Sequence, residues 1–279
     1  MAPVWKCKWD EAMRERFAAV VRQMREDAIT LGHPFLMLGV CSYMVSILEE
    51  TFPDTFFIKP DRDRFDYIYT REKLATLSGK KLQSKRNHCN KFRKSYPNYE
   101  YRPLTKDMIP ECIAVEVNWR AVTKEDNEDT EELSEELRSM TRVFDLWDEI
   151  GAIGGTIWVD GKLIAFTFGC PITNKVFDVC VEKADTAYEG AFSIINQEFA
   201  QHLPEQYEYM NREEDLGIEG LRYAKLSYKP DILLEKSVVM EKYPLAQEES
   251  QEKIKEETIA LWRDTFHDAE PFIQLYFSR

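Results

Sequence analysis

The sequence predicts an α/β (α+β) fold in which a mixed sheet is flanked by helices. Apolar residues recur at helical spacing in two long segments, and short β-type runs alternate with these helices. Three strand patterns in succession then lead into a further helix between residues 152 and 203. With 44% hydrophobic and 13% aromatic residues, the chain has enough apolar side chains for a substantial core.

The first part of the chain alternates helices with strands. Apolar residues from Trp9 to Leu31 recur every three or four positions, which predicts an amphipathic helix. Three short runs rich in apolar and aromatic residues are expected strands: Phe35–Val40, Thr55–Ile58 and Phe65–Tyr69. Lys73 to Tyr96 then predicts a strongly basic helix.

One strand and two helices are expected next. Tyr99 to Pro103 is typical of a strand, and Lys106 to Val122 of a helix with Thr105 or Asp107 as its cap. The apolar spacing from Leu133 to Trp147 predicts another helix, which ends at Gly151.

An antiparallel meander is the most informative stretch. The dipeptide Asp160-Gly161 favours a tight hairpin between its first two strands. A helix beginning at Gly190 links the last meander strand to a strand that we expect to lie parallel to it, because helical crossovers join parallel neighbours. The expected elements, in order, are strands at 153–159, 163–170 and 176–182, the helix to Leu203, a strand at 207–211, a helix at 217–227 and a strand at 232–240.

Charge and cysteine usage narrow the class of protein. The formal net charge of −13 disfavours broad attraction to nucleic acid, so transfer RNA is a disfavoured partner and a small-molecule substrate is expected. The six cysteines fall in no CxxC pair, which favours reduced thiols. No stretch approaches the roughly 20 apolar residues of a membrane helix. We therefore expect a cytoplasmic protein; its oligomeric state is open.

Three segments carry a resemblance to a known family: FDYIYTREKL, LATLSGKKLQSKRNHCNKF and NREEDLGIEGLRYAKLSYKPDILLEK. They resemble the bacterial family named after the C-terminal domain of phosphatidylglycerol lysyltransferase, over most of residues 30 to 240. The resemblance implies two tandem GNAT-like lobes, distantly similar to the Fem aminoacyltransferases, with transferase activity. It also implies that residues 1–95 form an incomplete first lobe with the basic helix, residues 96–243 the second lobe, and residues 244–279 a helical tail similar to the start of a further GNAT domain.

The resemblance also implies where a donor would bind. In GNAT enzymes the strands on either side of the central helix splay apart and acyl-coenzyme A enters the gap, its pyrophosphate held by a glycine-rich turn at the helix N-terminus. The matching residues here are Tyr188, Gly190 and Ala191, but Glu189 stands where a basic residue is usual. Gly190 has the alternative role of letting the helix pack closely. The donor is therefore either acyl-coenzyme A or an aminoacyl-tRNA.

Candidate catalytic residues follow the same resemblance. Glu182 ends the strand before the central helix, where a GNAT base is often found, and Glu213 and Glu214 follow the strand after it. Tyr223 or Tyr228 would supply the acid that protonates the leaving group. The alternatives are a charge at a hairpin end for Glu182, a structural network for the acids and core packing for the tyrosines.

Candidate binding residues are mostly basic. Helical spacing brings Lys81, Lys85 and His88 near one face of the basic helix, with Arg86 beside them, where they could hold a phosphate or carboxylate. A solvated face paired with nearby acids is the alternative. Substrate-binding roles are expected for three residues after the second splayed strand: Asn211, Arg212 and Asp215. The four histidines lack ligand spacing, so no metal site is expected.

Two functions are compatible with these residues. The first is an acyl- or aminoacyltransferase acting on an amine-bearing or lipid-like acceptor. The second is a catalytically inactive GNAT-like module that binds a small anionic or amino-acid-like ligand, or a protein partner; Glu189 in the cofactor turn favours it. Handling of transfer RNA ranks third, because the basic helix would have to overcome a repulsive global field.

Overall fold

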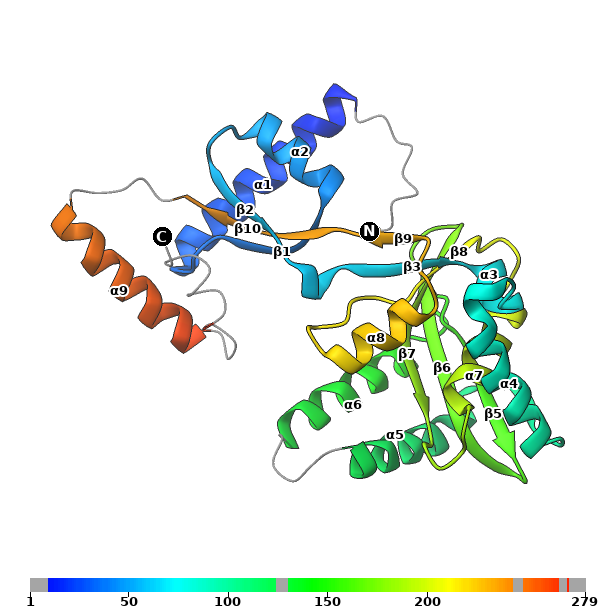
Figure 1. The fold of residues 1–279 in the computed structure, drawn as a ribbon. Coiled ribbons are helices and arrows are strands. Elements are labelled where there is room, and N and C mark those ends of the chain that lie inside the picture. The colour runs from blue at the N-terminus through cyan, green and yellow to red at the C-terminus, as the bar shows by residue number, and fades with distance from the viewer. Residues whose placement is uncertain (1–9, 124–129, 243–247, 266–269, 271–279) are drawn as a thin grey trace. The chain divides into compact units, whose positions relative to one another are not determined.

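The computed structural model describes residues 10–123, 130–242, 248–265 and 270 (Figure 1). Of these, residues 62–235 form one compact unit, and the segments before and after them form a second. The chain therefore passes from one unit to the other at Asp61-Arg62 and returns at Glu235-Lys236. The boundaries expected near residues 95 and 243 stay a prediction, and they do not coincide with these two crossings.

The smaller unit is a three-stranded sheet with helices. Its elements are α1 (Glu11–Leu31), β1 (Leu36–Cys41), α2 (Ser42–Thr51), β2 (Phe56–Pro60), β10 (Lys236–Glu241) and α9 (Glu248–Thr265). The strand order is β1-β10-β2, and both pairings are antiparallel. The N-cap Asp10 of α1 accepts a hydrogen bond from the Met13 N–H, which satisfies a donor that the helix itself leaves free. Val21, Leu48 and Val239 pack in the core between the helices and this sheet.

The larger unit contains a seven-stranded sheet in the order β4-β5-β6-β7-β8-β3-β9. Its strands are β3 (Asp66–Thr70), β4 (Glu100–Pro103), β5 (Ile153–Val159), β6 (Lys162–Pro171), β7 (Val176–Ala184), β8 (Tyr209–Asn211) and β9 (Ile232–Leu234). Its α-helices are α3 (Arg71–Thr76), α4 (Gln83–Ser95), α5 (Ile109–Thr123), α6 (Thr130–Asp145), α7 (Ala191–His202) and α8 (Glu219–Ser227). Short 3-10 helices lie at Arg62–Arg64, Lys80–Leu82 and Lys106–Met108.

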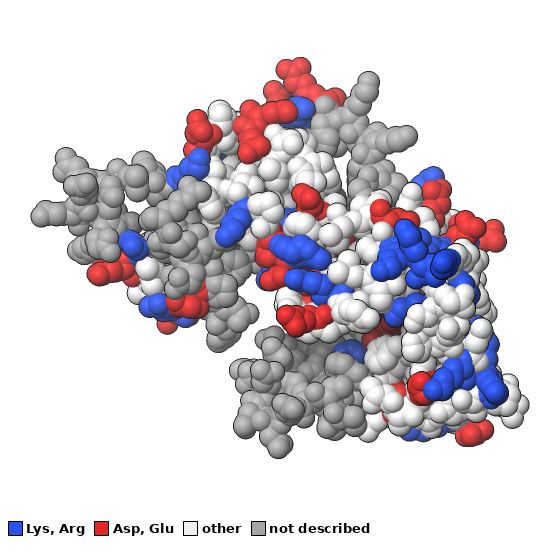
Figure 2. Space-filling model, viewed as in Figure 1, with Lys and Arg blue, Asp and Glu red and all other residues white. Residues whose placement is uncertain are grey.

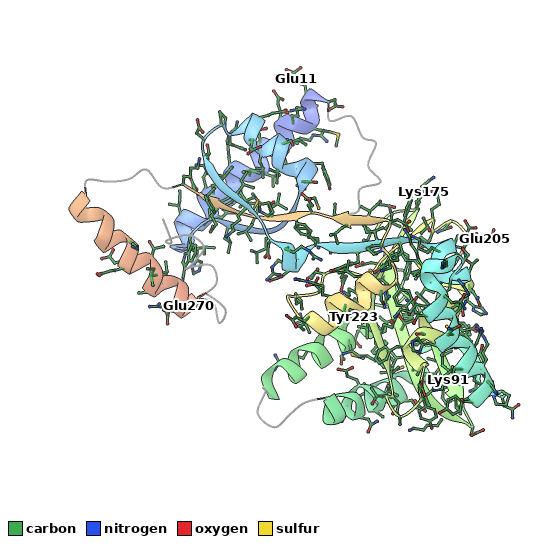
Figure 3. The ribbon with its side chains drawn as sticks, viewed as in Figure 1. Glu11, Lys91, Lys175, Glu205, Tyr223 and Glu270 are labelled. Atoms are coloured by element: carbon green, nitrogen blue, oxygen red, sulfur yellow. The ribbon has the colours of Figure 1, made fainter. Side chains whose placement is uncertain are left out.

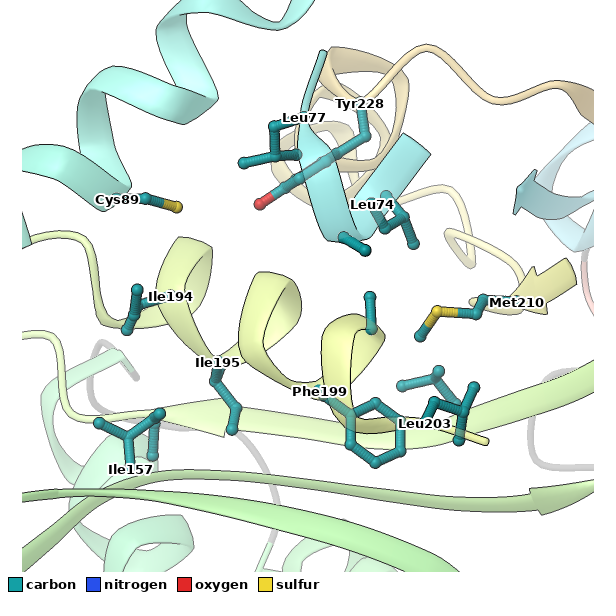
Figure 4. Close-up of a cluster of buried hydrophobic side chains, with 14 of the residues drawn as sticks. Leu74, Leu77, Cys89, Ile157, Ile194, Ile195, Phe199, Leu203, Met210 and Tyr228 are labelled. Atoms are coloured by element: carbon teal, nitrogen blue, oxygen red, sulfur yellow. The ribbon is translucent and has the colours of Figure 1, made fainter. Parts of the chain in front are cut away.

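Two hydrophobic clusters cover the faces of this sheet. On one face, α7 packs against β5, β6 and β7, and α3 and α4 pack on α7 in turn. Ile194, Ile195 and Phe199 of α7 are almost fully buried there (Figure 4). On the other face, α5 packs against β6 and β7. The central helix α7 is therefore held between the sheet and a second helical layer.

The meander, its hairpin and the parallel crossover are confirmed. Asp160 and Gly161 have φ angles of 49° and 77°, the positive values that a two-residue hairpin turn of this kind requires. β5, β6 and β7 are antiparallel neighbours, and β8 lies parallel to β7 after α7.

Several expected elements differ in the structure. The basic segment from Lys73 to Tyr96 is two helices, because Leu77 and Gly79 take φ angles of 48° and 86° and interrupt it. The expected strand at 232–240 is divided between β9 and β10, which belong to different sheets. The helix α2 was not expected, and the cap candidate Thr105 precedes a 3-10 turn without a side-chain capping bond.

Candidate functional site beside strand β7

β7 extends beyond the end of β8, while the expected splay of the two strands stays a prediction. They pair only from Val176–Tyr209 to Asp178–Asn211, after which β8 ends and β7 continues to Ala184. The segment of β7 beyond Asp178 therefore has no strand beside it on that edge within the described residues. Glu182 lies on this segment, and Arg212 directly follows the end of β8.

We call the region beside this unpaired edge of β7 the opening, and a largely buried ion pair lies there. Arg212 Nη2 donates to Glu182 Oε1 at 2.8 Å, and both side chains are 12% exposed. Asn196 Nδ2 of α7 donates to the other oxygen, Glu182 Oε2, at 3.0 Å. Both carboxylate oxygens of Glu182 are thus engaged, and the carboxylate holds the guanidinium in place.

Arg212 is enclosed by aromatic rings. Its Cζ lies 5.0 Å from the ring centre of Tyr228 and 5.9 Å from that of Tyr69. Burial alone would lower the pKa of Arg212, but Glu182 together with Tyr69 and Tyr228 outweighs burial, and the pKa is raised. The second terminal nitrogen, Nη1, is buried without a hydrogen-bond partner among the described residues. Arg212 therefore stays charged and keeps one donor group for a further acceptor.

Two lysines approach the same place from other elements. Lys85 Nζ of α4 lies 4.3 Å from the centre of the Tyr228 ring, and burial together with Arg212 lowers the pKa of this lysine. Lys225 Nζ of α8 donates to the carbonyl of Arg212 at 2.6 Å and to that of Glu214. Burial, followed by the charge of Arg212, lowers the pKa of Lys225 to about 8. Positive charge therefore converges on the opening.

Tyr228 is the predicted tyrosine that reaches this site. Its ring points between α4 and α7, with the hydroxyl directed toward α7 (Figure 4). It is 5% exposed, and burial raises the pKa of its hydroxyl to about 12, so the phenol remains protonated at neutral pH. Tyr223, in contrast, is 78% exposed and projects from α8 (Figure 3).

A second group of side chains lies where β7 and β8 still pair. Oxygens of Asp178 and Glu213 and the sulfur of Cys180 all lie within 4.8 Å of one another. Burial and the charge of Asp178 raise the pKa of Glu213 to about 8. Asn211 donates from Nδ2 to Asp66 Oδ2 at 3.1 Å and accepts from the Glu213 N–H at 3.0 Å. The predicted residues Asn211 and Glu213 thus belong to this group.

Asp215 is fully buried and belongs to a separate network, whose two arginines are about one third exposed. Arg222 Nη2 donates to Asp215 Oδ1 at 2.7 Å, and Arg62 and Tyr67 donate to Oδ2 at 3.1 and 2.5 Å. Burial would raise the pKa of Asp215, but the hydrogen bonds from Arg222 and Tyr67 outweigh it and lower the pKa. This arrangement matches the structural alternative for the acidic segment.

The turn before α7 packs against α4. Gly190 has a φ of 89°, and a Cβ on it would lie 2.8 Å from the carbonyl oxygen of His88. Lys91 Nζ of α4 donates to Glu189 Oε1 at 2.7 Å, and the Tyr188 ring centre lies 5.3 Å from that of Tyr96. Ala191 is buried. These contacts favour the packing role of Gly190, while its cofactor role stays a prediction.

The predicted anion-binding residues of the basic helix do not all converge. Lys and Arg side chains gather over the region of α3 and α4 (Figure 2). Lys81 and His88 are exposed, and Arg86 donates to the carbonyls of Leu77 and Gly79, closing the turn before its own helix. Of this set, Lys85 alone is placed at the opening by these contacts.

Sequence reasoning missed Asn196, Tyr69 and the thiol of Cys180. Asn196 carries a usable signal, because it is a polar residue between apolar positions of α7 and is 1% exposed. A cavity of about 510 Å³ was also unexpected. It is lined by Glu111, Ala114, Val115, Asn118, Trp158, Gly161, Lys162, Leu163 and Asp185, none of them a predicted site residue.

Residues 12–240 match the family model described as phosphatidylglycerol lysyltransferase, C-terminal. The chain belongs to this family. Among solved structures, it is similar to a conserved protein of unknown function from Bacteroides thetaiotaomicron, with 50% identity, coverage of 81% of this chain and 75% of that one, and a TM-score of 0.75. It is also similar to L-PGS from Bacillus licheniformis, with 14% identity, coverage of 86% and 77%, and a TM-score of 0.58.

Both the predicted family and the predicted GNAT-like mixed sheet flanked by helices are confirmed. An uncharacterized protein of Mycoplasmoides gallisepticum is 24% identical over 175 residues, 62% of this chain and 55% of that protein. The chain thus spans about half the length of this curated relative. Among the described residues, the helices are all too short or too polar to cross a membrane.

Proposed function

We propose that the chain transfers an acyl or aminoacyl group to an amine-bearing or lipid-like acceptor, with the donor in the opening beside β7. One observation carries the proposal: the two strands pair over three residues, and β7 then continues alone past Glu182 to Ala184. This leaves one strand edge beside α7 available for a ligand, in a chain whose family has this chemistry.

Arg212 is the residue best placed to act on the donor carbonyl. Its ion pair with Glu182 fixes the guanidinium, and its buried Nη1 keeps a donor group for an additional acceptor. Attack on an ester or thioester places negative charge on the carbonyl oxygen, and a preorganised cation stabilises that charge. Lys85 adds a second positive charge beside Tyr228. These residues would bind the donor and the tetrahedral intermediate.

Proton transfer would be carried out by a tyrosine and by one of the carboxylates. Tyr228 stays protonated at neutral pH and would donate to the leaving group. Glu182 is engaged by Arg212 and Asn196, so it serves first to position the guanidinium. The base for the acceptor amine remains a prediction among Glu182, Glu213 and Glu214. The donor, acyl-coenzyme A or aminoacyl-tRNA, is likewise a proposal.

A second function is favoured by the turn before α7. The close approach of Gly190 to His88 and the ion pair between Glu189 and Lys91 favour a turn used for packing over one that binds a pyrophosphate. A chain with such a turn could bind a small anionic or amino-acid-like ligand at Arg212 without catalysis. This alternative predicts binding without turnover.

The two functions are separated by measuring binding and transfer on the same protein. We expect acetyl-coenzyme A or lysyl-tRNA to raise the melting temperature, since a ligand that binds the native state stabilises it. We also expect transfer of the radiolabelled acyl or lysyl group to a mixture of amines and lipids. Stabilisation without transfer would support the binding module, and failure of both donors to bind or react would contradict the transferase.

Matched variants test the site itself. Lys85→Met removes the lysine at Tyr228, whereas Lys94→Met removes an exposed lysine from the end of the same helix. We expect Lys85→Met to lower transfer at least about 10-fold, since loss of one preorganised donor costs about 100-fold to 1,000-fold at its strongest. Lys94→Met should retain full transfer, and equal losses in both variants would exclude a specific role for Lys85.

A further inference from the structure

Two thiols and two carboxylates lie near the last residue pair between β7 and β8, Asp178 and Asn211. Ligand atoms of Asp178, Cys180 and Glu213 lie within 4.8 Å of one another. The Cys180 thiol also donates to Asp178 Oδ2 at 3.9 Å, and Cys170 lies opposite Asp178 on the neighbouring strand β6. Because both sulfur and oxygen ligands are present, this group differs from an ordinary surface cluster of acids.

The backbone explains why residues so far apart in sequence meet here. Cys170 of β6 lies opposite Asp178 of β7 in the strand register. The register shifts between Phe168 and Gly169, so that Cys180 is the extra residue of a bulge, a feature that redirects a side chain. Glu213 has a φ of 53°, which turns the chain directly after β8. Three separate segments therefore supply the four groups.

The charges of these groups oppose one another. Burial and the charge of Asp178 raise the pKa values of both the Cys170 and Cys180 thiols, and the same two causes raise the pKa of Glu213. Lys225 lowers the pKa of Glu213, but its Nζ donates to the backbone carbonyls of Arg212 and Glu214. A bound dication would offset this repulsion directly.

We propose that Cys170, Asp178, Cys180 and Glu213 form a binding site for a thiophilic divalent cation, with zinc the best match to two thiolates and two carboxylates. Zinc binds sulfur at about 2.3 Å and oxygen at about 2.0–2.2 Å, usually with four ligands. A tetrahedral site therefore needs ligand atoms about 3–4 Å apart. The ligand atoms of Asp178, Cys180 and Glu213 reach this from their 4.8 Å limit by rotation about side-chain bonds, and Cys170 would join them from the strand opposite Asp178.

The site goes beyond the proposed transferase and does not depend on it. Binding converts the two thiols to thiolates and releases their protons to solvent, with no oxidation or reduction. The sequence pattern did not predict it, because the ligands form no CxxC pair and include no histidine. Occupation would also fix Glu213 beside the opening as a ligand.

Cobalt(II) substitution tests the proposal on the full chain under reducing conditions. Thiolate ligation of cobalt gives a charge-transfer absorption in the near ultraviolet, which carboxylates alone do not give. We expect this band in the unaltered protein and its loss in Cys180→Ala. Zinc affinity, measured by competition with a chromophoric chelator, should fall more than about 100-fold, beyond the 10- to 100-fold cost of losing a supporting partner.

Two further variants make the result specific. Cys112→Ala removes a fully buried thiol on α5 in the same unit and should leave the band and the affinity unchanged. Glu213→Gln should keep the thiolate band and weaken zinc binding. Circular dichroism verifies the fold of each variant. The proposal is overturned if the unaltered chain gives no charge-transfer band, or if the band survives in both Cys170→Ala and Cys180→Ala. No donor or acceptor is needed, so the outcome is separate from that of the transfer assay.

Discussion

Replacing Gly190 by alanine tests whether close packing against α4 requires a glycine at this position. Gly190 has a φ of 89°, and an added Cβ would lie 2.8 Å from the His88 carbonyl oxygen and 3.2 Å from Phe92 Cβ. The left-handed backbone costs an alanine about 1–2 kcal/mol. Overpacking against the neighbouring helix costs about a further 1–3 kcal/mol. We therefore expect the free energy of unfolding to fall by about 2–5 kcal/mol.

Gly161→Ala is the matched control. Gly161 also has a positive φ, 77°, but nothing lies within 4 Å of the position of its Cβ. Its cost should be that of the backbone alone, about 1–2 kcal/mol. The effect of alanine on the unfolded chain is common to both variants and cancels in the difference. Urea unfolding followed by far-ultraviolet circular dichroism measures both. Equal losses in the two variants would refute the close packing of Gly190 on α4.

Three other perturbations test the site and the core. Arg212→Met removes the ion pair of Glu182 and leaves its hydrogen bond from Asn196, and breaking a buried pair costs about 3–5 kcal/mol. The effects of Arg212→Met and Glu182→Gln on the free energy of unfolding in urea should therefore be strongly non-additive. Additivity within about 0.5 kcal/mol would contradict the pairing. Lys225 binds its proton more weakly in the folded protein, where its pKa is about 8, than in the unfolded chain, where it is 10.5. The free energy of unfolding should therefore rise as the pH increases from about 8 to 10.5. Lys225→Met should flatten this rise. Phe199 is 1% exposed, so Phe199→Ala should lower the free energy of unfolding in urea by about 3–5 kcal/mol. A decrease below about 1 kcal/mol would count against the core position of α7.

Local signals allowed much of the fold to be predicted. Asp160-Gly161 specifies its hairpin through two backbone angles, and the apolar spacing of α7 depends on nearby residues alone. The break at Leu77 was harder to predict, because it lies inside a run with continuous basic helical character. The division of residues 232–240 between two sheets has no local signal, since both halves are apolar and extended.

The sequence indicated several residues of the site, but it did not predict which of them contact one another. Glu182 and Arg212 were both candidates from their positions at strand ends, but their ion pair joins residues 30 apart in sequence. Helix and strand periodicities relate only nearby residues, so they cannot predict a contact over this sequence separation. Lys85 could not be separated from Lys81 by helical spacing, because the contact that distinguishes it is with Tyr228, which follows α8. Cys170 and Cys180 meet through strand pairing and a bulge, features that the spacing of cysteines does not reveal.

The pairing of β3 predicts where the larger unit must begin. β3 lies between β8 and β9 and bonds to both, and its residues Tyr67, Ile68 and Tyr69 are fully buried. A fragment of residues 96–235 would lack this strand, leaving β8 and β9 with open edges and removing Tyr69 from Arg212.

A fragment of residues 62–235 keeps β3 and corresponds to the compact unit. We expect it to unfold cooperatively on heating, whereas the 96–235 fragment should show no cooperative transition by calorimetry or circular dichroism. If the shorter fragment instead melted cooperatively at the same temperature, β3 would be dispensable. The boundary expected near residue 95 would then describe the folding unit better than the crossing at residue 61. Since residues 62–95 supply β3 with Tyr69 and also the helices α3 and α4 that pack on α7, the expected result would mean that this segment is needed for both the sheet and the site.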